Sequence, residues 1–435
     1  MFDATHDPAA LSWVAAANTM ETDFPLQNLP LGVMRSTGDG TRIGVAIGEA
    51  VLDLRVAGES GLLNGLANEV RSALQAHNLD RYLALAPAEW TAARRVCFEI
   101  LRRGGPGEIA HGKGAPLLLP RADLELVVPA TIGDYTDFYA SLHHATNVGT
   151  MLRPDNPLLP NYKWIPIGYH GRASSIVASG TPIRRPHGQT RDDATAPPVV
   201  VPTKRLDYEV EMGFWIGGSN ALGTPVPIAE AHARIAGLSL LNDWSARDVQ
   251  TWEYQPLGPF LAKNFASTVS PWLVTADALR PFRTAAAPRE SGDPAPLPYL
   301  HDADDQARGA FDIGLECWLT SAAMRAAGVP PMLVSRSNLQ QLYWTPAQLV
   351  AHHGMNGCNL RPGDLLGSGT VSGPEPSMRA CMLERTWRGT EPLQLPTGEV
   401  RRWIEDGDDV TLRARAAAPG RRSIGFGDCS GVVYA

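Results

Sequence analysis

Leu206-Asp-Tyr-Glu-Val-Glu-Met-Gly-Phe214 is the stretch from which the fold can first be argued, because apolar and acidic side chains alternate along it. Alternation with a period of two predicts a β-strand. Glu209 and Glu211 then project from one face, about 7 Å apart along the strand. Two neighbouring carboxylates repel each other unless water or a cation lies between them. The pattern therefore fits either a solvated sheet face or half of a site for an oxygen-binding cation.

Two further acids, Asp137 and Asp243, are candidates for the other half of such a site. Asp243 follows the apolar run at residues 235–241, so it stands at the exit of a buried element, where a helix or turn cap is the other interpretation. Four carboxylates without cysteine or clustered histidine would select calcium, magnesium or manganese over zinc. Convergence of the four depends on the fold.

His144 lies in a stretch, residues 134–147, that also contains Asp137. If this stretch is helical, the two side chains lie two turns apart on one face. A histidine oriented by a carboxylate makes a general base near neutral pH, whereas a lone histidine is otherwise a structural hydrogen-bonding group. His143 cannot share the face of His144, and we expect it to be exposed or packed.

The chain has 435 residues, which predicts two domains. Short apolar runs in residues 44–54 predict small strands, and residues 61–103 have helical spacing with Pro87 as an interruption. Residues 104–120 are rich in Gly and Pro and read as a connection. We therefore expect an N-terminal domain at 1–128 and a C-terminal domain at 129–435.

The C-terminal part is dominated by short strands with Gly and Pro between them, which predicts a β-dominated core. Residues 231–240 and 346–353 are the expected helices, and residues 186–198 and 284–298 the expected surface loops. No GxSxG or HExxH motif occurs, which removes the commonest serine-hydrolase and metalloprotease interpretations.

Composition narrows the classes of partner and compartment. A formal net charge of −7 argues against nucleic acid or anionic membrane as a partner, because both require basic surface. Five cysteines, without a CxxC pair, predict reduced thiols. No basic leader and no apolar stretch of about 20 residues is present. We expect a cytoplasmic protein.

Several longer strings occur together and in order. They are Asp134-Tyr-Thr-Asp-Phe-Tyr139, His144-Ala-Thr-Asn-Val-Gly149, Gly168-Tyr-His-Gly-Arg-Ala-Ser-Ser175, Ser179-Gly-Thr-Pro-Ile-Arg-Arg185, Asn242-Asp-Trp-Ser-Ala-Arg-Asp248, Trp252-Glu-Tyr254, Pro256-Leu-Gly-Pro-Phe260, Asn356-Gly-Cys-Asn-Leu-Arg-Pro-Gly-Asp-Leu-Leu366, Ser368-Gly-Thr-Val-Ser-Gly-Pro-Glu-Pro376 and Ile424-Gly-Phe-Gly427. Through these strings the chain resembles the fumarylacetoacetase family from residue 24 nearly to its C-terminus.

The resemblance implies a β-dominated α+β fold with a small N-terminal SH3-like barrel, a C-terminal mixed β-roll and a homodimeric assembly. It also implies hydrolysis of the carbon–carbon bond of fumarylacetoacetate to fumarate and acetoacetate, the last step of tyrosine and phenylalanine breakdown. Alternatives are another acylpyruvate-type hydrolase or a decarboxylase of the same superfamily, and a non-catalytic binding protein of this fold.

The resemblance also assigns roles to individual residues. The divalent metal, Ca2+, Mg2+ or Mn2+, would be held by Asp137, Glu209, Glu211 and Asp243, with a second position at Asp243, Lys263 and Ser267. The base would be His144 with Glu384 as its orienting acid, the oxyanion donors Arg247, Gln250 and Lys263, and the substrate contacts Tyr139, Arg153, Tyr169, Arg247, Gln250, Tyr254 and Thr370. The substrate is a small anionic diketo acid, and Arg153, Arg247 and Lys263 would offset its charge locally.

Overall fold

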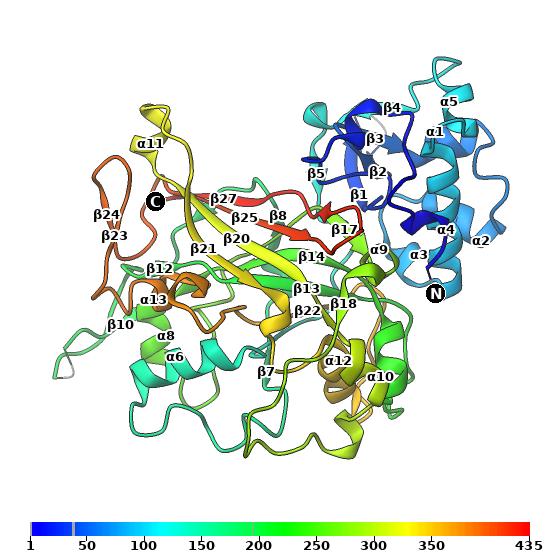
Figure 1. The fold of residues 1–435 in the computed structure, drawn as a ribbon. Helices are drawn as coiled ribbons and strands as arrows, with labels where there is room; N and C mark the ends of the chain where they lie inside the picture. Colours follow the sequence, from blue (N-terminus) through cyan, green and yellow to red (C-terminus); the bar gives the residue numbers. More distant parts are fainter. Residues whose placement is uncertain (1, 37–39, 194) are drawn as a thin grey trace.

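The largest element of the fold is a mixed sheet that runs through both halves of the chain (Figure 1). The computed structural model describes residues 2–36, 40–193 and 195–435. The main path of the sheet is β4-β3-β2-β1-β17-β14-β13-β22-β6-β7, with β5 paired to β1, β16 paired to β14, and β8 paired to β16. Its strands are β1 (Leu31–Ser36), β2 (Gly40–Ile47), β3 (Ala50–Asp53), β4 (Leu118–Pro120), β5 (Leu126–Val127), β6 (Tyr135–Phe138), β7 (Gly168–His170), β8 (Ile176–Ala178), β13 (Val210–Ile216), β14 (Ile235–Asp243), β16 (Ser267–Val269), β17 (Trp272–Thr275) and β22 (Leu365–Gly367).

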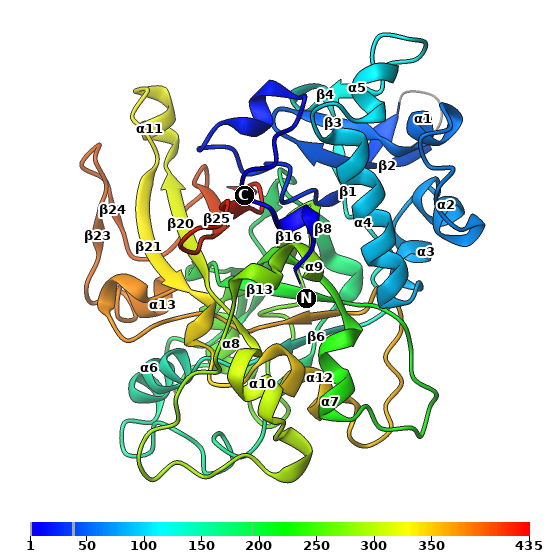
Figure 2. The same cartoon turned by 45° about the vertical axis from the view of Figure 1, so that its right-hand side comes forward.

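A second, six-stranded sheet has the order β21-β20-β25-β27-β9, with β26 paired to β25. Its long β20–β21 hairpin carries α11 at the tip and stands out from the rest of the molecule (Figure 2). The remaining strands form two-stranded pairs. These strands are β9 (Ile183–Arg184), β20 (Ile313–Thr320), β21 (Met332–Asn338), β25 (Asp409–Ala416), β26 (Ile424–Gly425) and β27 (Cys429–Tyr434) in the sheet, and β10 (His187–Thr190), β11 (Val199–Pro202), β12 (Leu206–Asp207), β15 (Ser245–Ala246), β18 (Arg283–Thr284), β19 (Ala310–Phe311), β23 (Leu393–Gln394) and β24 (Val400–Arg401) in the pairs.

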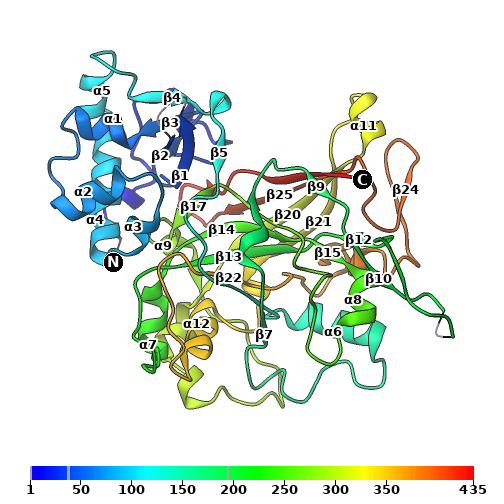
Figure 3. The ribbon, with the colours of Figure 1, turned by 180° about the vertical axis from the view of Figure 1, so that it is seen from behind.

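The helices are short, and most fall into three groups. The N-terminal helices α1 to α5 lie beside the N-terminal strands, α6, α8 and α13 lie at the opposite end of the molecule, and α7, α10 and α12 lie near one another below the sheet (Figures 1 and 3). The α-helices are α1 (Leu54–Glu59), α2 (Asn68–Leu74), α3 (Asp80–Leu83), α4 (Pro87–Leu101), α5 (Pro106–Ala110), α6 (Leu142–Leu152), α7 (Ile228–Ala231), α8 (Arg247–Glu253), α9 (Ala276–Leu279), α10 (Ala303–Arg308), α11 (Ala322–Ala326), α12 (Pro346–Gly354) and α13 (Met382–Arg385). Across the described ranges, every helix is too short or too polar to traverse a bilayer.

The N-terminal strands are not a separate sheet. Leu31 of β1 pairs with Leu273 of β17, so the sheet passes from one half of the chain to the other without a break. The buried core that lies behind it combines side chains of both halves, including Trp215 and Leu241 with those of the first 130 residues. Within the described residues these pairings form an open path and no closed barrel is seen, so the SH3-like barrel is not confirmed.

Local predictions in the N-terminal half are confirmed. β2 and β3 occupy the predicted strand region, and α2 to α4 the region with helical spacing. Pro87 is the first residue of α4, where its missing N–H costs no hydrogen bond. The predicted connection at 104–120 contains the short helix α5 and the strand β4.

Three predictions in the C-terminal half need correction. Residues 231–240 were expected to be helical, but the apolar run from Ile235 is the central strand β14, buried along its whole length. A strand covered on both faces shows no alternation, so its sequence resembles that of a buried helix. Residues 134–147 are not one helix, because strand β6 precedes α6. The expected loop at 186–198 contains β10, and residue 194 lies outside the described residues. The helix expected at 346–353 is confirmed as α12.

Candidate active site

Four acidic side chains converge where β6, β13 and β14 lie in one sheet. Glu209 precedes β13, Glu211 lies in it, and Asp243 ends the neighbouring β14, which is antiparallel to β13. Asp137 comes from β6, which β22 joins to β13. One carboxylate oxygen of each residue lies within 4.8 Å of the others, and all four residues are buried. The interpretation of Glu209 and Glu211 as a solvated face is therefore wrong.

The electrostatics of this cluster suit a hard cation. Burial, and then the charge of Asp243, raises the pKa of Asp137 to about 8. Burial, Asp137 and Glu209 likewise raise the pKa of Glu211 well above its ordinary value. Asp137 Oδ1 and Glu211 Oε1 are buried and receive no hydrogen bond from any described residue. Oxygen ligands that repel one another and lack donors fit Ca2+, Mg2+ or Mn2+.

Two cations hold one side of the cluster. Lys263 Nζ donates to Glu209 Oε2 at 2.5 Å and to Asp243 Oδ2 at 2.6 Å, and Arg247 Nη2 donates to Glu209 Oε1 at 2.8 Å. Burial acts to raise the pKa of Glu209, but Lys263 and Arg247 outweigh it and hold this pKa below its ordinary value. Burial acts to lower the pKa of Lys263, but Asp243 and Glu209 raise it above its ordinary value. Lys263 is therefore an ammonium donor, and Ser267 Oγ likewise donates to Asp243 Oδ1 at 2.9 Å.

A buried histidine–carboxylate pair adjoins the cluster. His144, in the first turn of α6, places Nδ1 2.6 Å from Glu384 Oε2 of α13. Donation from Nδ1 to the carboxylate leaves Nε2 with a free lone pair. The carboxylate that orients His144 is thus Glu384, and the pairing with Asp137 along one helix is wrong.

Glu384 is held by several donors besides His144. Asn147 Nδ2 donates to Oε1 at 2.8 Å, while Ser372 Oγ at 2.7 Å and Cys381 Sγ at 3.2 Å donate to Oε2. Burial acts to raise the pKa of Glu384, but His144 and the hydrogen bonds from Asn147 and Ser372 lower it to about 2. The side chain is therefore a fixed anion that keeps the imidazole in one orientation and tautomer.

These groups face a cavity of about 430 Å³. Tyr169 OH donates to Asp243 Oδ2 at 3.0 Å across its floor, and Thr370 Oγ1 is buried without a hydrogen-bond partner in the described part of the chain. Of the predicted site residues, those that line the cavity are Asp137, Tyr139, His144, Arg153, Tyr169, Glu209, Arg247, Gln250, Tyr254, Lys263 and Thr370. Glu211, Asp243, Ser267 and Glu384 are buried next to these residues and contact them or their partners. The fold therefore brings every predicted site residue into one region.

Sequence profiles of known families match nearly the whole chain. The profile described as fumarylacetoacetase N-terminal matches residues 27–129, and that described as fumarylacetoacetate (FAA) hydrolase C-terminal matches residues 134–433. The chain belongs to the fumarylacetoacetase family.

Individual members of the fumarylacetoacetase family are similar over their full lengths. The fumarylacetoacetase of Bos taurus is 46% identical over 429 residues, which cover 97% of this chain and 98% of that protein. That of Homo sapiens is 47% identical over 422 residues, covering 95% and 96%. Among solved structures, a fumarylacetoacetate hydrolase from Exiguobacterium antarcticum superposes with a TM-score of 0.51 at 16% identity, covering 94% of this chain and 99% of that one, which shows a shared fold.

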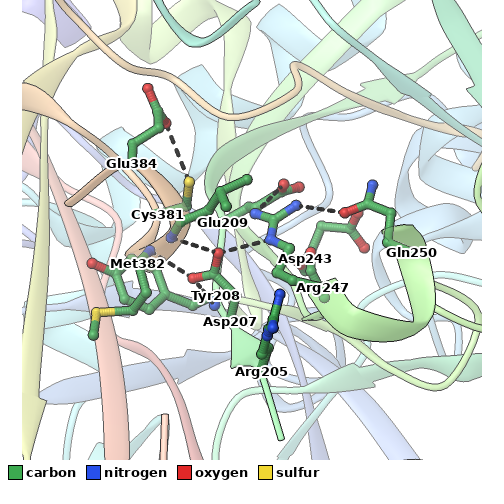
Figure 4. Close-up of polar contacts among 12 residues, drawn as sticks. Arg205, Asp207, Tyr208, Glu209, Asp243, Arg247, Gln250, Cys381, Met382 and Glu384 are labelled. Atoms are coloured by element: carbon green, nitrogen blue, oxygen red, sulfur yellow. Dashed lines mark hydrogen bonds and ion pairs between the residues drawn. The ribbon is translucent and has the colours of Figure 1, made fainter. Parts of the chain in front are cut away.

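Sequence reasoning missed three charged residues at the site. Arg205 and Arg388 line the cavity, and neither guanidinium has a carboxylate partner among the residues that the structure describes. Asp207 is fully buried and accepts a hydrogen bond from Arg247 Nε at 2.8 Å (Figure 4). Asp207 and Glu209 alternate in the stretch that predicted the strand, so a signal was present for Asp207. The resemblance to the fumarylacetoacetase family, however, gave no role to Asp207.

Proposed function

We propose that this protein hydrolyses fumarylacetoacetate to fumarate and acetoacetate. The observation that carries the proposal is the buried His144–Glu384 pair, which faces the same cavity as the carboxylate cluster and the cationic donors. Full-length similarity to curated fumarylacetoacetases, 46% identity over 97% of the chain, supports the same substrate. Cleaving a carbon–carbon bond with water is favoured by a base that activates the water and by groups that stabilise the developing negative charge.

In this proposal His144 is the general base. Its Nε2 takes a proton from a water molecule, and Glu384 stabilises the imidazolium that forms. The water oxygen bonds to the ketone carbon on the fumaryl side, and the bond from this carbon to the neighbouring CH2 then breaks. The electron pair passes to the acetoacetate fragment as an enolate. Transfer of the proton from His144 to the former CH2 carbon then gives acetoacetate. The reaction consumes one water molecule overall.

Negative charge that develops on the diketone oxygens has two sources of stabilisation. Gln250 Oε1 accepts from Arg247 Nη1 at 3.0 Å, which orients the amide so that Nε2 remains a free donor. With Lys263 it faces the cavity, and losing one donor of this kind costs about 10²–10³ in rate. A divalent cation held by Asp137, Glu209, Glu211 and Asp243 would act as a Lewis acid on the same oxygens.

The two carboxylates of the proposed substrate would be bound by unpaired positive charge in the cavity. Arg247 and Lys263 are already neutralised by Glu209, Asp207 and Asp243. Among the described residues, the cavity arginines without carboxylate partners are Arg153, which was predicted, and Arg205 and Arg388 in addition, and they supply its unpaired positive charge. Tyr139, Tyr169, Tyr254 and Thr370 would contribute hydrogen bonds from the same walls.

The finer predictions on assembly and context form part of the proposal. Exposed apolar side chains gather between α8 and β16, with Leu257 exposed at 97% and Phe260 at 68%. We propose that a second copy of the chain covers them in a homodimer, which sedimentation of the purified protein and of Phe260→Asp would test. Four further statements remain predictions: a cytoplasmic location, a place in tyrosine and phenylalanine catabolism, a boundary near residue 128, and an N-terminal SH3-like barrel. A second metal position at Asp243, Lys263 and Ser267 is also a prediction, in which Lys263 would have to bind through its backbone carbonyl, because its ammonium has no lone pair.

The proposed function is tested by incubating the purified protein with fumarylacetoacetate and following the loss of the diketone absorbance. We expect turnover that dialysis against a chelator abolishes and that Ca2+, Mg2+ or Mn2+ restores. Hydrolysis of acylpyruvates but not of fumarylacetoacetate would instead indicate another hydrolase of the superfamily. Retained ligand binding without any turnover would indicate a non-catalytic protein.

A further inference from the structure

Asp207 is a fully buried carboxylate that contacts both Arg247 and the start of α13, the helix that carries Glu384 (Figure 4). On one side, its Oδ2 accepts from Arg247 Nε at 2.8 Å. On the other, Oδ1 accepts from the backbone N–H of Met382 at 2.6 Å, and Oδ2 from that of Leu383 at 3.0 Å. Both oxygens therefore receive hydrogen bonds from the first residues of α13, and one of them also from the guanidinium.

The contact with Arg247 decides how this guanidinium is held. Its three nitrogens donate to three different partners, Nε to Asp207, Nη2 to Glu209 and Nη1 to Gln250. Glu209 also accepts a hydrogen bond from Lys263 and belongs to the carboxylate cluster, so its position does not depend on Arg247 alone. Among the described residues, Arg247 is the cationic side chain that Asp207 binds. Asp207 accepts from Nε and so fixes the plane of the guanidinium from its Nε end.

The contact with α13 decides where Glu384 lies. α13 is a single short helix, Met382–Arg385, and its first two N–H groups are those that Asp207 accepts. Glu384 follows one residue later and presents its carboxylate to His144. Free N–H groups at a buried helix start are costly, so removing their acceptor would shift or fray this turn. Asp207 thus acts on the orientation of His144 indirectly, first through α13 and then through Glu384.

We propose that Asp207 is a positioning residue that couples Arg247, which orients the oxyanion donor Gln250, to the His144–Glu384 pair, a role that rests on the proposed hydrolysis. Because the same carboxylate binds Arg247 and α13, it fixes the position of Arg247 relative to His144. It does not touch the substrate cavity and so acts only through Arg247 and α13.

The test compares Asp207→Asn with a matched variant, Asp408→Asn. Asp408 is also fully buried and accepts from an arginine Nε, that of Arg401 at 2.9 Å, and from a backbone N–H, that of Glu405 at 2.9 Å, but Arg401, unlike Arg247, does not line the cavity. We expect both variants to lose stability and only Asp207→Asn to lose kcat, by about 10²-fold, with a smaller change in KM. Equal kcat values for the two variants would overturn the proposal.

Coupling is measured by adding Glu384→Gln to each background. If Asp207 acts partly through Glu384, the loss in the double variant with Asp207→Asn is smaller than the product of the single losses. Multiplicative losses would contradict the coupling. If Asp207→Asn does not fold, Asp207→Glu serves instead, because it keeps the charge but displaces the carboxylate from Arg247 and α13 by one methylene group.

A spectroscopic readout separates this proposal from the proposed function. The short bond from His144 Nδ1 to Glu384 should give a downfield N–H proton signal in NMR spectra, assigned by its absence in His144→Ala. We expect the signal to shift or vanish in Asp207→Asn and to persist in Asp408→Asn, whether or not the protein turns over fumarylacetoacetate. An unchanged signal in Asp207→Asn would refute the link through α13.

Discussion

At the residue scale, His144 is the side chain on which turnover depends most. Replacing it with alanine removes the proton acceptor but none of the four clustered carboxylates, so we expect kcat to fall by about 10²–10⁴-fold or more while cation binding is retained. His143→Ala is the matched control, since His143 is the adjacent residue on α6 and does not line the cavity. Steady-state kinetics with calorimetric titration of the cation decide the matter, and near-normal turnover of His144→Ala would remove it from the mechanism.

Glu384 gives a prediction about pH. Its pKa in the folded protein is about 2, below the ordinary 4.5, so its charged form stabilises the fold above pH 4.5 and this contribution is lost as pH falls toward 2. Glu384→Gln has no such contribution. Denaturant unfolding should therefore show a stability difference between the two proteins that is constant at higher pH and shrinks through this window. A difference that does not depend on pH would contradict the charged pair.

Most individual site residues could be predicted, but local patterns did not predict how they pair, and only the likeness to the fumarylacetoacetase family named Glu384 as the partner of His144. The position of Glu209 and Glu211 on one face followed from their spacing. The partner of His144 did not, because Glu384 lies 240 positions away in sequence. Arg205 and Arg388 carry no local pattern that separates a cavity arginine from a surface one, so only the folded chain identifies them.

At the scale of elements, strands β6, β13 and β14 hold like charges together at a cost. In the absence of a cation, the raised pKa of Glu211 means that its charged form destabilises the fold at neutral pH. We expect Glu211→Gln to melt at a higher temperature than the unmodified protein in chelator, and to gain less when Ca2+, Mg2+ or Mn2+ is added. Differential scanning fluorimetry measures both effects, with the exposed Glu49→Gln as control. A lower melting temperature in chelator would contradict the repulsion.

The same elements show why secondary structure was only partly predictable. Both strands are buried throughout, but acidic residues alternate with apolar ones at the start of β13, so it was identified, whereas β14 has no such alternation and was mistaken in part for a helix. The strand β6 and helix α6 are separated by a few residues, and the apolar pattern does not mark the change. Helix α12 was predicted correctly, and the structure shows that Thr345 caps it and Pro346 begins it.

At the scale of the whole molecule, the continuous sheet makes the two halves interdependent. Removing residues 1–128 would leave the β17 edge unpaired and expose Leu273, Leu241 and Trp215, which pack against the N-terminal core. We expect the fragment 129–435 to aggregate, although the family profiles divide the chain near that point. Expression and light scattering of the fragment test this. A soluble fragment with cooperative unfolding would show that the halves fold independently.

The central claim, that water activated at His144 cleaves the carbon–carbon bond on the fumaryl side, is tested most directly with labelled water. Turnover of fumarylacetoacetate in H2-18O should place one 18O atom in a carboxylate of fumarate and none in freshly formed acetoacetate, as read by mass spectrometry. Labelled fumarate should form at least about 10²-fold more slowly when His144→Ala replaces the unmodified protein. Label in acetoacetate, or cleavage that introduces no solvent oxygen at all, would contradict the mechanism.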